Sequence, residues 1–260
     1  MKINRVILSS NANPTYADFW NPLSKVYSEK FGISPTLVWM GTEEEAKEFN
    51  ISDEYGEVIY QPFHPDFHIP WQTTWALFWA TQFYPEDVCI IMGIDQVPLS
   101  NRFFNKVHPL SDDDYAMLIA DAYRPHFWDL EGSASPSSYH VAKGSTFDKV
   151  HQFEGDWLKE AEKVHASGVK GFWEDTEGRW GIDETYSCKK LRADHGVTIH
   201  SFNGFGELVE HRIECERHKE TPYDVDRLRS GWYSESHLCR PFGNHVEYIT
   251  KLFNDIPDCR

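Results

Sequence analysis

The sequence predicts an α/β fold in which helices cover both faces of a mixed, mostly parallel sheet. Short apolar runs alternate with helical patterns through the first 150 residues, as βαβ units require. The run VCIIM at 88–92 is apolar throughout, which is typical of a central strand buried on both faces. The 260 residues, 40% hydrophobic and 25% charged, suffice for one large core. We therefore expect a single domain over 1–260, with a sheet-rich part at 1–150 and a more irregular part at 151–260.

Each element is predicted from its local pattern of apolar and turn-forming residues. The expected strands span 5–9, 36–40, 57–60, 88–92, 115–120, 139–142 and 197–200. The expected helices span 17–31, 71–83, 183–191 and 246–253, with a short helix after Thr42 and a longer one from Gly144 to about Ala166. Gly32 and Pro85 are expected helix stops, and T-E-E-E from Thr42 matches a capping box. The segments 171–181 and 201–245 show little regular period.

Composition excludes several classes of function. Acidic residues outnumber basic ones by 41 to 25, and a net charge of −16 disfavours binding to nucleic acid and to anionic membranes. Five cysteines without a CxxC pair argue against a disulfide scaffold or a zinc knuckle and favour reduced thiols. No stretch approaches the ~20 apolar residues of a membrane helix, and the N-terminal apolar run is too short for a signal peptide. We expect a cytoplasmic protein without an integral membrane segment.

The segment VCIIMGIDQVPLS at 88–100 is the most informative for function. A buried strand runs directly into Gly93 and Asp95, and ligands of open α/β sheets bind beyond the carboxyl ends of strands. A carboxylate there can hold a metal ion or a ribose hydroxyl, and Gly93 allows a backbone or phosphate to approach closely. The alternative is that Asp95 only caps the turn before Pro98, and the local pattern leaves both interpretations open.

The longer segment VCIIMGIDQVPLSNRFF resembles the DxD region of GT-A-fold nucleotide-diphospho-sugar glycosyltransferases. The resemblance implies a three-layer α/β sandwich and an acidic pair that binds a divalent cation, usually manganese, which bridges the two phosphates of the donor. Asp95 matches the last Asp of the motif, and Gly93 stands in place of the first. The motif is therefore degenerate, and this departure weakens the implied metal site.

Further segments resemble this family in the order that it expects. Ser9 and Ser10, at the end of the first strand, lie where such enzymes hold the nucleoside, and Gln72 matches a frequent Gln of the helix before the motif. YHVAKGSTF at 139–147 is similar to the strand and helix beside the sugar. WGIDE at 180–184 resembles an acidic acceptor-side motif, which implies a catalytic role for Asp183 or Glu184. The alternative is a structural role, because Asp at the N-cap and Glu in the first turn both stabilise the start of a helix.

The last resembling segment is SHLCRP at 236–241, where such enzymes place a His that completes the metal shell. The resemblance implies that His237 binds the cation with Asp95, and Arg240 could meet a phosphate. The alternative is an ordinary surface loop. Residues 151–260 would then form the acceptor side of the domain.

Together these segments predict a transferase that moves a sugar from a UDP- or GDP-sugar to an acceptor hydroxyl. A non-catalytic protein that binds nucleotide sugars or carbohydrates on the same fold is the main alternative, favoured by Gly93. A nucleotidyltransferase ranks low because the loop SSNANPTYADF after the first strand has neither glycine nor a basic residue. A zinc hydrolase ranks low because HPDFH at 64–68 contains Pro65 and lacks the glutamate of HExxH. A further alternative is another metal-dependent hydrolase, which would differ from a transferase because its substrate needs no nucleotide.

Overall fold

A seven-stranded sheet forms the centre of the chain in the computed structural model, which describes residues 1–102, 104–122, 134–171, 181–215 and 218–260. The strand order is β3-β2-β1-β4-β7-β6-β8. The strands are β1 (Arg5–Asn11), β2 (Ser34–Met40), β3 (Glu57–Gln61), β4 (Val88–Ile91), β6 (Tyr115–Met117), β7 (His140–Lys143) and β8 (Ile199–Ser201). Strands β3, β2, β1 and β4 run parallel, β7 is antiparallel to both β4 and β6, and β8 is parallel to β6. The predicted mixed, mostly parallel sheet is confirmed.

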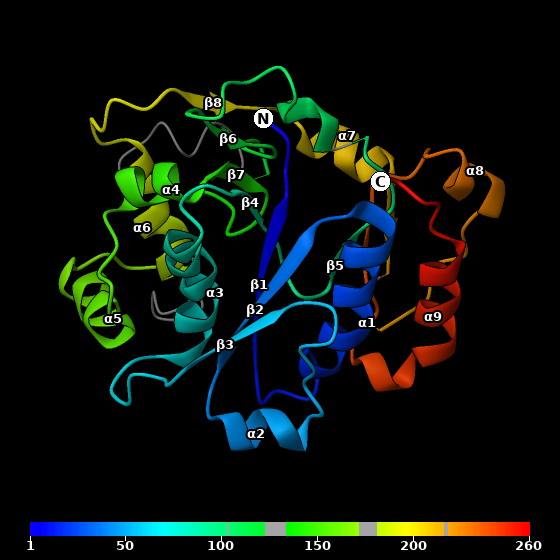
Figure 1. The fold of residues 1–260 in the computed structure, drawn as a ribbon, viewed down its shortest axis with the longest axis horizontal. Helices are drawn as coiled ribbons and strands as arrows, with labels where there is room; N and C mark the ends of the chain where they lie inside the picture. Colours follow the sequence, from blue (N-terminus) through cyan, green and yellow to red (C-terminus); the bar gives the residue numbers. More distant parts are fainter. Residues whose placement is uncertain (103, 123–133, 172–180, 216–217) are drawn as a thin grey trace.

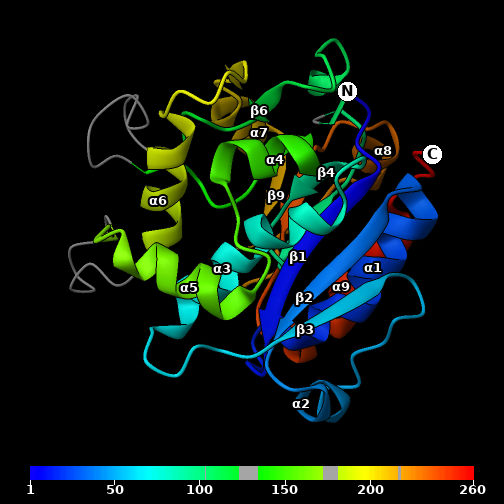
Figure 2. The ribbon, with the colours of Figure 1, turned by 60° about the vertical axis from the view of Figure 1, so that its left-hand side comes forward.

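Helices cover both faces of this sheet, which makes a three-layer sandwich (Figures 1 and 2). One face carries α3 (Ile69–Ala80), α4 (Gly144–His151), α5 (Trp157–Ala166) and α6 (Ile182–Leu191), and the other carries α1 (Trp20–Val26) and α9 (Val246–Asp255). Side chains alternate along β1 between the two layers. Val6 and Leu8 belong to the core with α1 and α9, whereas Ile7 belongs to the core with α3 to α6. Alternate residues of β1 therefore pack into the hydrophobic cores on opposite faces of the sheet.

Local sequence signals set the ends of several elements. Thr42 and Glu45 form the predicted capping box at the start of α2 (Glu43–Glu48). The expected helix at 17–31 is continuous, with a 3-10 turn before α1 and a π-helical turn after it. It ends at Gly32, whose φ of 63° favours glycine. Helix α3 and the 3-10 turn that follows it end before Pro85, as expected.

The structure corrects two element predictions. The expected helix from Gly144 to about Ala166 is two helices, because Gln152 takes a left-handed conformation (φ 56°) and ends α4. Asp156 then begins α5 by accepting a hydrogen bond from the Lys159 backbone N–H at 3.0 Å. The strand expected at 115–120 covers only Tyr115–Met117.

A second, three-stranded sheet joins a strand after β4 to two strands from 201–245, a segment in which little regular pattern was visible. Its order is β5-β10-β9, with β5 at Gln96–Pro98, β9 at Arg212–Glu214 and β10 at Glu235–His237. Helices α7 (Phe205–Glu210) and α8 (Val225–Arg229) lie in the same part of the chain. Strand β5 follows directly on β4 and the turn after it, so the small sheet fixes the chain at the carboxyl end of β4.

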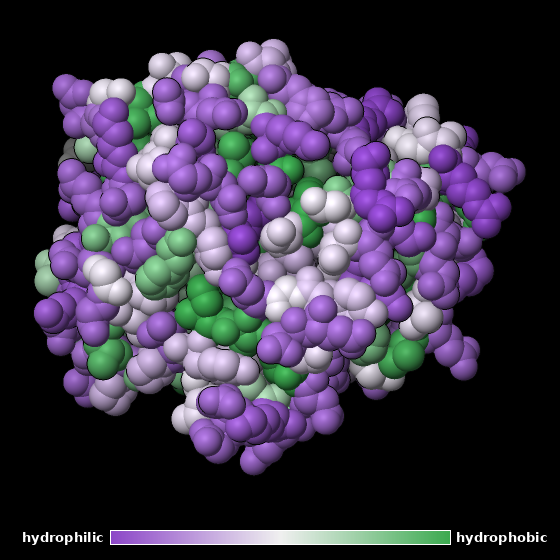
Figure 3. All heavy atoms as spheres, viewed as in Figure 1, coloured by the Kyte–Doolittle hydropathy of each residue, from purple (hydrophilic) through white to green (hydrophobic). Residues whose placement is uncertain are grey.

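The surface in view is mainly hydrophilic (Figure 3). Hydrophilic residues dominate the face in Figure 3, and hydrophobic residues form small, separate patches on it. Among the residues that the structure describes, no helix has both the length and the apolar composition needed to cross a membrane.

Gly144, at the start of α4, provides a test of how tightly this helix joins the end of α3. A Cβ atom at Gly144 would lie 2.3 Å from the carbonyl oxygens of Thr81 and Tyr84, whereas a Cβ at Gly155 would meet nothing within 4 Å. We expect Gly144→Ala to lower the free energy of unfolding by about 3 kcal/mol through overpacking. Gly155→Ala should change it by less than about 0.5 kcal/mol. Urea unfolding of the two variants compares the sites, and equal stability would contradict the packing described here.

Candidate functional site

The carboxyl ends of β1 and β4 lie side by side at one edge of the main sheet. Ile7 is paired with Ile91, and the Met92 backbone N–H donates to the Ile7 carbonyl at 3.1 Å. The chain then turns through Gly93 and Asp95 into β5. The Gly93 backbone N–H donates to the side-chain Oε1 of Gln96 at 2.8 Å, which closes this turn. The turn therefore stands at the edge where open α/β sheets bind ligands.

The carboxylate of Asp95 faces two cationic side chains. Its Oδ2 lies 3.1 Å from Nε2 of His237 and 3.1 Å from Nη1 of Arg240. The small sheet creates this meeting, because His237 pairs with Gln96 and the Leu238 backbone N–H donates to the Asp95 carbonyl at 2.8 Å. The structure thus brings together three of the residues predicted from sequence, and it places His237 in a strand rather than a loop.

Further charged residues, on β9 and β10, contact His237 or its partners. Nδ1 of His237 is 3.2 Å from Oε1 of Glu214, which is its register partner on β9, and Nη1 of Arg212 donates to Oε2 of Glu214 at 2.9 Å. Arg212 also donates through Nε to Glu235. Both nitrogens of the His237 ring therefore face a carboxylate.

These pairs shift the titration of the site. Burial lowers the pKa of His237, but the hydrogen bonds to Asp95 and Glu214 and the charge of Asp95 outweigh it and raise the pKa to about 9. Burial alone would raise the pKa of Asp95. The hydrogen bond and charge of His237 and the charge of Arg240 together outweigh this burial effect and lower it. At neutral pH the carboxylate is therefore ionised beside a guanidinium and an imidazolium.

The loop after β1 also reaches this cluster. Arg240 donates through Nη1 to the hydroxyl of Tyr16, and its Cζ lies 5.2 Å from the centre of that ring. Ser9 and Ser10, in the last part of β1, are buried. Arg240 therefore joins the β1 loop to the Asp95 turn.

Gln72, which the resemblance placed on the donor side, lies buried in α3. Its side chain is fully buried, its Oε1 accepts from the His64 backbone N–H at 2.8 Å, and its Nε2 donates to the carbonyls of His64 and Phe67. The amide therefore holds the loop before α3. These contacts use both ends of the amide.

Asp183 and Glu184 occupy the buried first turn of α6. Burial and the negative charge of Glu184 raise the pKa of Asp183, although a hydrogen bond with Thr74 opposes the shift. Oδ2 of Asp183 is buried and has no hydrogen-bond partner among the described residues. The Glu184 carbonyl accepts from the Ser135 backbone N–H at 3.1 Å. Trp180 of this motif, like Phe103 of the DxD-like segment, lies outside the described residues.

Contacts with α3 connect this acidic pair to the edge that carries Asp95. Asn11, the last residue of β1, donates through Nδ2 to the Thr73 hydroxyl at 3.3 Å, and the next residue, Thr74, contacts Asp183. Helix α3 runs antiparallel to the strands that flank it in the chain, so its first turns lie at the carboxyl edge of the sheet. The predicted donor-side and acceptor-side residues therefore occupy the same edge.

The side chains around Asp95 do not fit the divalent cation that the resemblance implied. Such a cation needs several oxygen or imidazole ligands, but Oδ2 of Asp95 faces the guanidinium of Arg240, which repels a cation. Gly93 supplies no carboxylate, and each ring nitrogen of His237 already faces a carboxylate. In the part of the chain that the structure describes, no group of three or more His, Cys, Asp and Glu is arranged to hold a metal ion.

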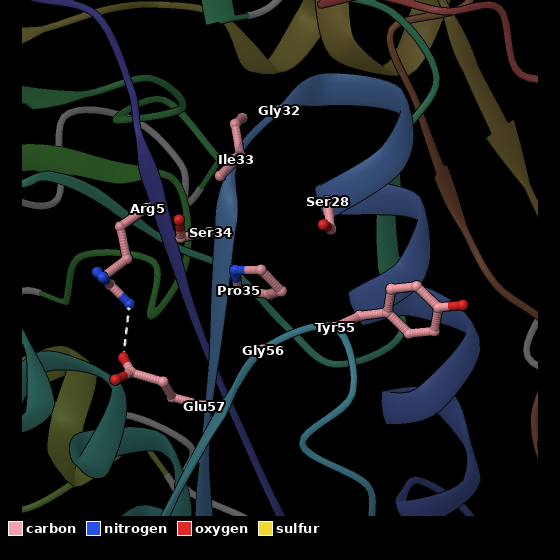
Figure 4. Close-up of a pocket in the computed structure, with 9 residues that line it drawn as sticks. All are labelled: Arg5, Ser28, Gly32, Ile33, Ser34, Pro35, Tyr55, Gly56 and Glu57. Atoms are coloured by element: carbon pink, nitrogen blue, oxygen red, sulfur yellow. Dashed lines mark hydrogen bonds and ion pairs between the residues drawn. The ribbon is translucent and has the colours of Figure 1, made fainter.

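A pocket of about 320 Å³ lies at the opposite, amino-terminal edge of the strands (Figure 4). Arg5 and Glu57 face each other in it, with Nη1 of Arg5 2.9 Å from Oε2 of Glu57. Arg5 also pairs with Asp87. Because these charges are already paired and no predicted site residue lines the pocket, we do not place the candidate site there.

Sequence reasoning missed several residues of the site. The sequence patterns did not predict Tyr16, Arg212, Glu214 or Glu235 as site residues. They placed Thr74 in the helix at 71–83 but gave it no role in the site. Tyr16 follows the first predicted strand closely, so its place in the loop at the sheet edge was the one usable signal. The residues of β9 and β10 gave no such signal, because three-residue strands are too short to show a period.

The fold resembles solved glycosyltransferase structures. The galactosyltransferase LgtC, solved in complex with donor and acceptor sugar analogs, is 12% identical, with a TM-score of 0.52 and coverage of 97% of this chain and 96% of LgtC. An active-site mutant of LgtC gives 11% identity, a TM-score of 0.52 and the same coverage. No family model and no curated sequence matches the chain. The likeness shows that the fold is GT-A-like.

Proposed function

We propose that this protein transfers a sugar from a nucleoside diphosphate sugar to an acceptor hydroxyl. The observation that carries the proposal is the meeting of Asp95, His237 and Arg240 beside the carboxyl ends of β1 and β4 on a GT-A-like fold. This edge is where an α/β sheet takes a nucleotide. The buried Ser9 and Ser10 on β1 would line the nucleoside side, and the loop to Tyr16 would lie along the donor.

The charges of the site suit the chemistry of this reaction. Breaking the bond between sugar and diphosphate builds negative charge on the leaving group, and fixed cationic groups in a partly buried site stabilise that charge. The guanidinium of Arg240 is one such group. His237, with its pKa raised to about 9, is also mainly protonated at neutral pH.

Asp183 and Glu184 are the proposed acceptor-side residues. The raised pKa of Asp183 beside the charge of Glu184 means that the pair retains a proton more readily than two separate carboxylates would. One carboxylate of the pair can then accept the proton of the attacking hydroxyl while the other stays neutral.

A thermal-shift screen of UDP-, GDP- and other nucleotide sugars tests the proposal. Ligand present at ~100 times its dissociation constant should raise the melting temperature by about 5–10 °C. We expect one donor to give this shift and Asp95→Ala to lose it, since that change removes the carboxylate that orients Arg240. Asp53→Ala, at an exposed position, is the control and should respond as the wild type does. A wild-type protein that responds to no donor would overturn the proposal.

A non-catalytic protein that binds nucleotide sugars is the second candidate, and Gly93 in place of an acidic residue is the observation that favours it. Release of the free nucleoside diphosphate from the donor that binds best separates the two functions. An enzyme releases it repeatedly and faster when acceptor sugars are added. A binding protein would hold the donor intact through the same incubation.

A further inference from the structure

We propose that Arg240 holds the donor diphosphate directly and that this site works without a divalent cation. The inference rests on the proposed function and concerns how the same site neutralises the donor. In the fold family that the sequence resembles, a metal ion supplies this positive charge. Here a guanidinium lies against the single carboxylate that remains, with Nη1 of Arg240 3.1 Å from Oδ2 of Asp95.

Another group fills the space beside Gly93, where the motif of the resembling family has its first carboxylate. A Cβ atom built on Gly93 would lie 2.9 Å from Oε1 of Gln96 and 3.1 Å from Oδ1 of Asp95. Oε1 of Gln96 is held there by the Gly93 backbone N–H at 2.8 Å. A neutral amide that closes the turn therefore occupies the space beside Asp95 in which a second acidic side chain would approach a cation.

The guanidinium retains donors for a phosphate. Its contacts with Asp95 and Tyr16 both use Nη1, and none of the described residues accepts a hydrogen bond from its Nε or Nη2. These two nitrogens form one edge of the planar fork that binds a phosphate through two parallel hydrogen bonds. The contacts of Nη1 with Asp95 and Tyr16 hold the guanidinium in place, so little side-chain freedom is lost on binding.

Burial strengthens this arrangement. The side chains of Arg240 and Asp95 are only 10% and 11% exposed, so the field of the guanidinium is weakly screened by water. Asp95 positions Arg240 in this scheme and does not itself contact the donor. The other two basic side chains of the cluster already have partners, since Arg212 donates to Glu214 and Glu235 and both ring nitrogens of His237 face carboxylates. Among the described basic residues of this cluster, Arg240 is therefore the one with two adjacent N–H groups left for a diphosphate.

Calorimetric titration with UDP, GDP, CDP and ADP, and with the matching nucleosides, tests the inference in EDTA and in manganese. We expect one nucleoside diphosphate to bind with the same affinity in both buffers. Arg240→Gln should weaken that binding by about 10- to 100-fold in both, because charge-assisted bonds to phosphate are lost. It should leave the affinity for the nucleoside unchanged. Arg240→Lys should recover part of the affinity, since it keeps the charge but not the fork.

Two controls make every outcome decisive. Arg102→Gln removes a half-exposed arginine outside the cluster and should leave diphosphate binding unchanged. Nucleoside binding by Arg240→Gln shows that this variant is folded. Diphosphate binding that requires manganese and disappears in EDTA overturns the inference but leaves the proposed transferase standing. Failure of every nucleoside diphosphate to bind the wild type in either buffer overturns both.

Discussion

Asp95→Asn is expected to lower the free energy of unfolding by about 3 kcal/mol, because it leaves the buried Arg240 and the partly buried His237 without their shared carboxylate. His237 and Arg240 both lie 3.1 Å from its Oδ2. The folded-state pKa of Asp95 lies below the ordinary value of 3.8, so its stabilising effect is complete well above that pH. The effect is lost as the pH falls through the lowered folded-state pKa. Urea unfolding at neutral pH measures the expected loss.

If Asp95 has only a structural role, Asp95→Asn should destabilise the fold and should change the affinities for nucleoside and nucleoside diphosphate to the same extent. The positioning role predicts that Asp95→Asn, measured well below its melting temperature, binds the nucleoside normally and the nucleoside diphosphate poorly. Asp53→Asn is the matched control, since the same change at an exposed position should alter neither stability nor binding. Equal stability of Asp95→Asn and Asp53→Asn would show that the Asp95 ion pairs contribute nothing.

The candidate site illustrates which features local sequence can predict. Asp95 could be found because a fully apolar strand leads into it, and a central strand directs its carboxyl end at the ligand-binding edge. His237 could be placed there only through the order of resembling segments. Its actual connection to Asp95 is the pairing of β10 with β5 across 142 positions, which no local period encodes. Glu214 meets His237 through the pairing of β9 with β10, which also has no local signal, and therefore escaped prediction.

The fold shows the same division between local and distant causes. Strands of the parallel core and helices with strong caps were predicted, because the apolar runs and Thr42 act within a few residues. The break between α4 and α5 was missed although Gly155 and the capping residue Asp156 lie between the two helices. Gln152 adopts a left-handed φ there while Trp157, five residues later, fills the core beneath α3. The signals at Gly155 and Asp156 were outweighed by the apolar residues that follow, and the two helices were predicted as one.

A buried Tyr115–His140–His151 cluster, between the sheet and α4, leads to the second large expected effect. Nε2 of His140 lies 2.5 Å from the Pro136 carbonyl, and the Tyr115 hydroxyl lies 2.9 Å from Nδ1 of His140 and 3.3 Å from Nε2 of His151. In the neutral state Nε2 of His140 donates to Pro136, and its Nδ1 accepts from Tyr115. A proton added at Nδ1 would remove that acceptor in a site without water access. Burial accordingly lowers the pKa of His140 to about 4, despite the opposing bond to Pro136.

This cluster is expected to make the protein less stable in acid. The unfolded chain binds a proton at each of these histidines below about pH 6.5, whereas the folded chain does not until the pH approaches 4 at His140. The contribution of His140 to the free energy of unfolding is therefore complete above about pH 6.5. At 1.36 kcal/mol per pKa unit, it falls by about 2 kcal/mol between pH 7 and pH 5. The pKa of His151 is lowered well below 6.5, first by burial and then by nearby positive charge, so it adds a loss of the same sign.

The difference between wild type and His140→Gln isolates this effect, because other buried groups act in the opposite direction. The raised pKa values of Glu235 (about 8) and His237 (about 9) favour the folded state as the pH falls, but they do so equally in both proteins. Glutamine can still donate to Pro136 but cannot titrate. Urea unfolding at pH 7 and pH 5 should therefore show the wild type losing about 2 kcal/mol more than His140→Gln. His108→Gln, at an exposed histidine, should follow the wild type. If His140→Gln instead loses as much stability as the wild type, His140 must be able to accept its proton in the folded core, and the hydrogen-bond direction assigned to Tyr115 is wrong.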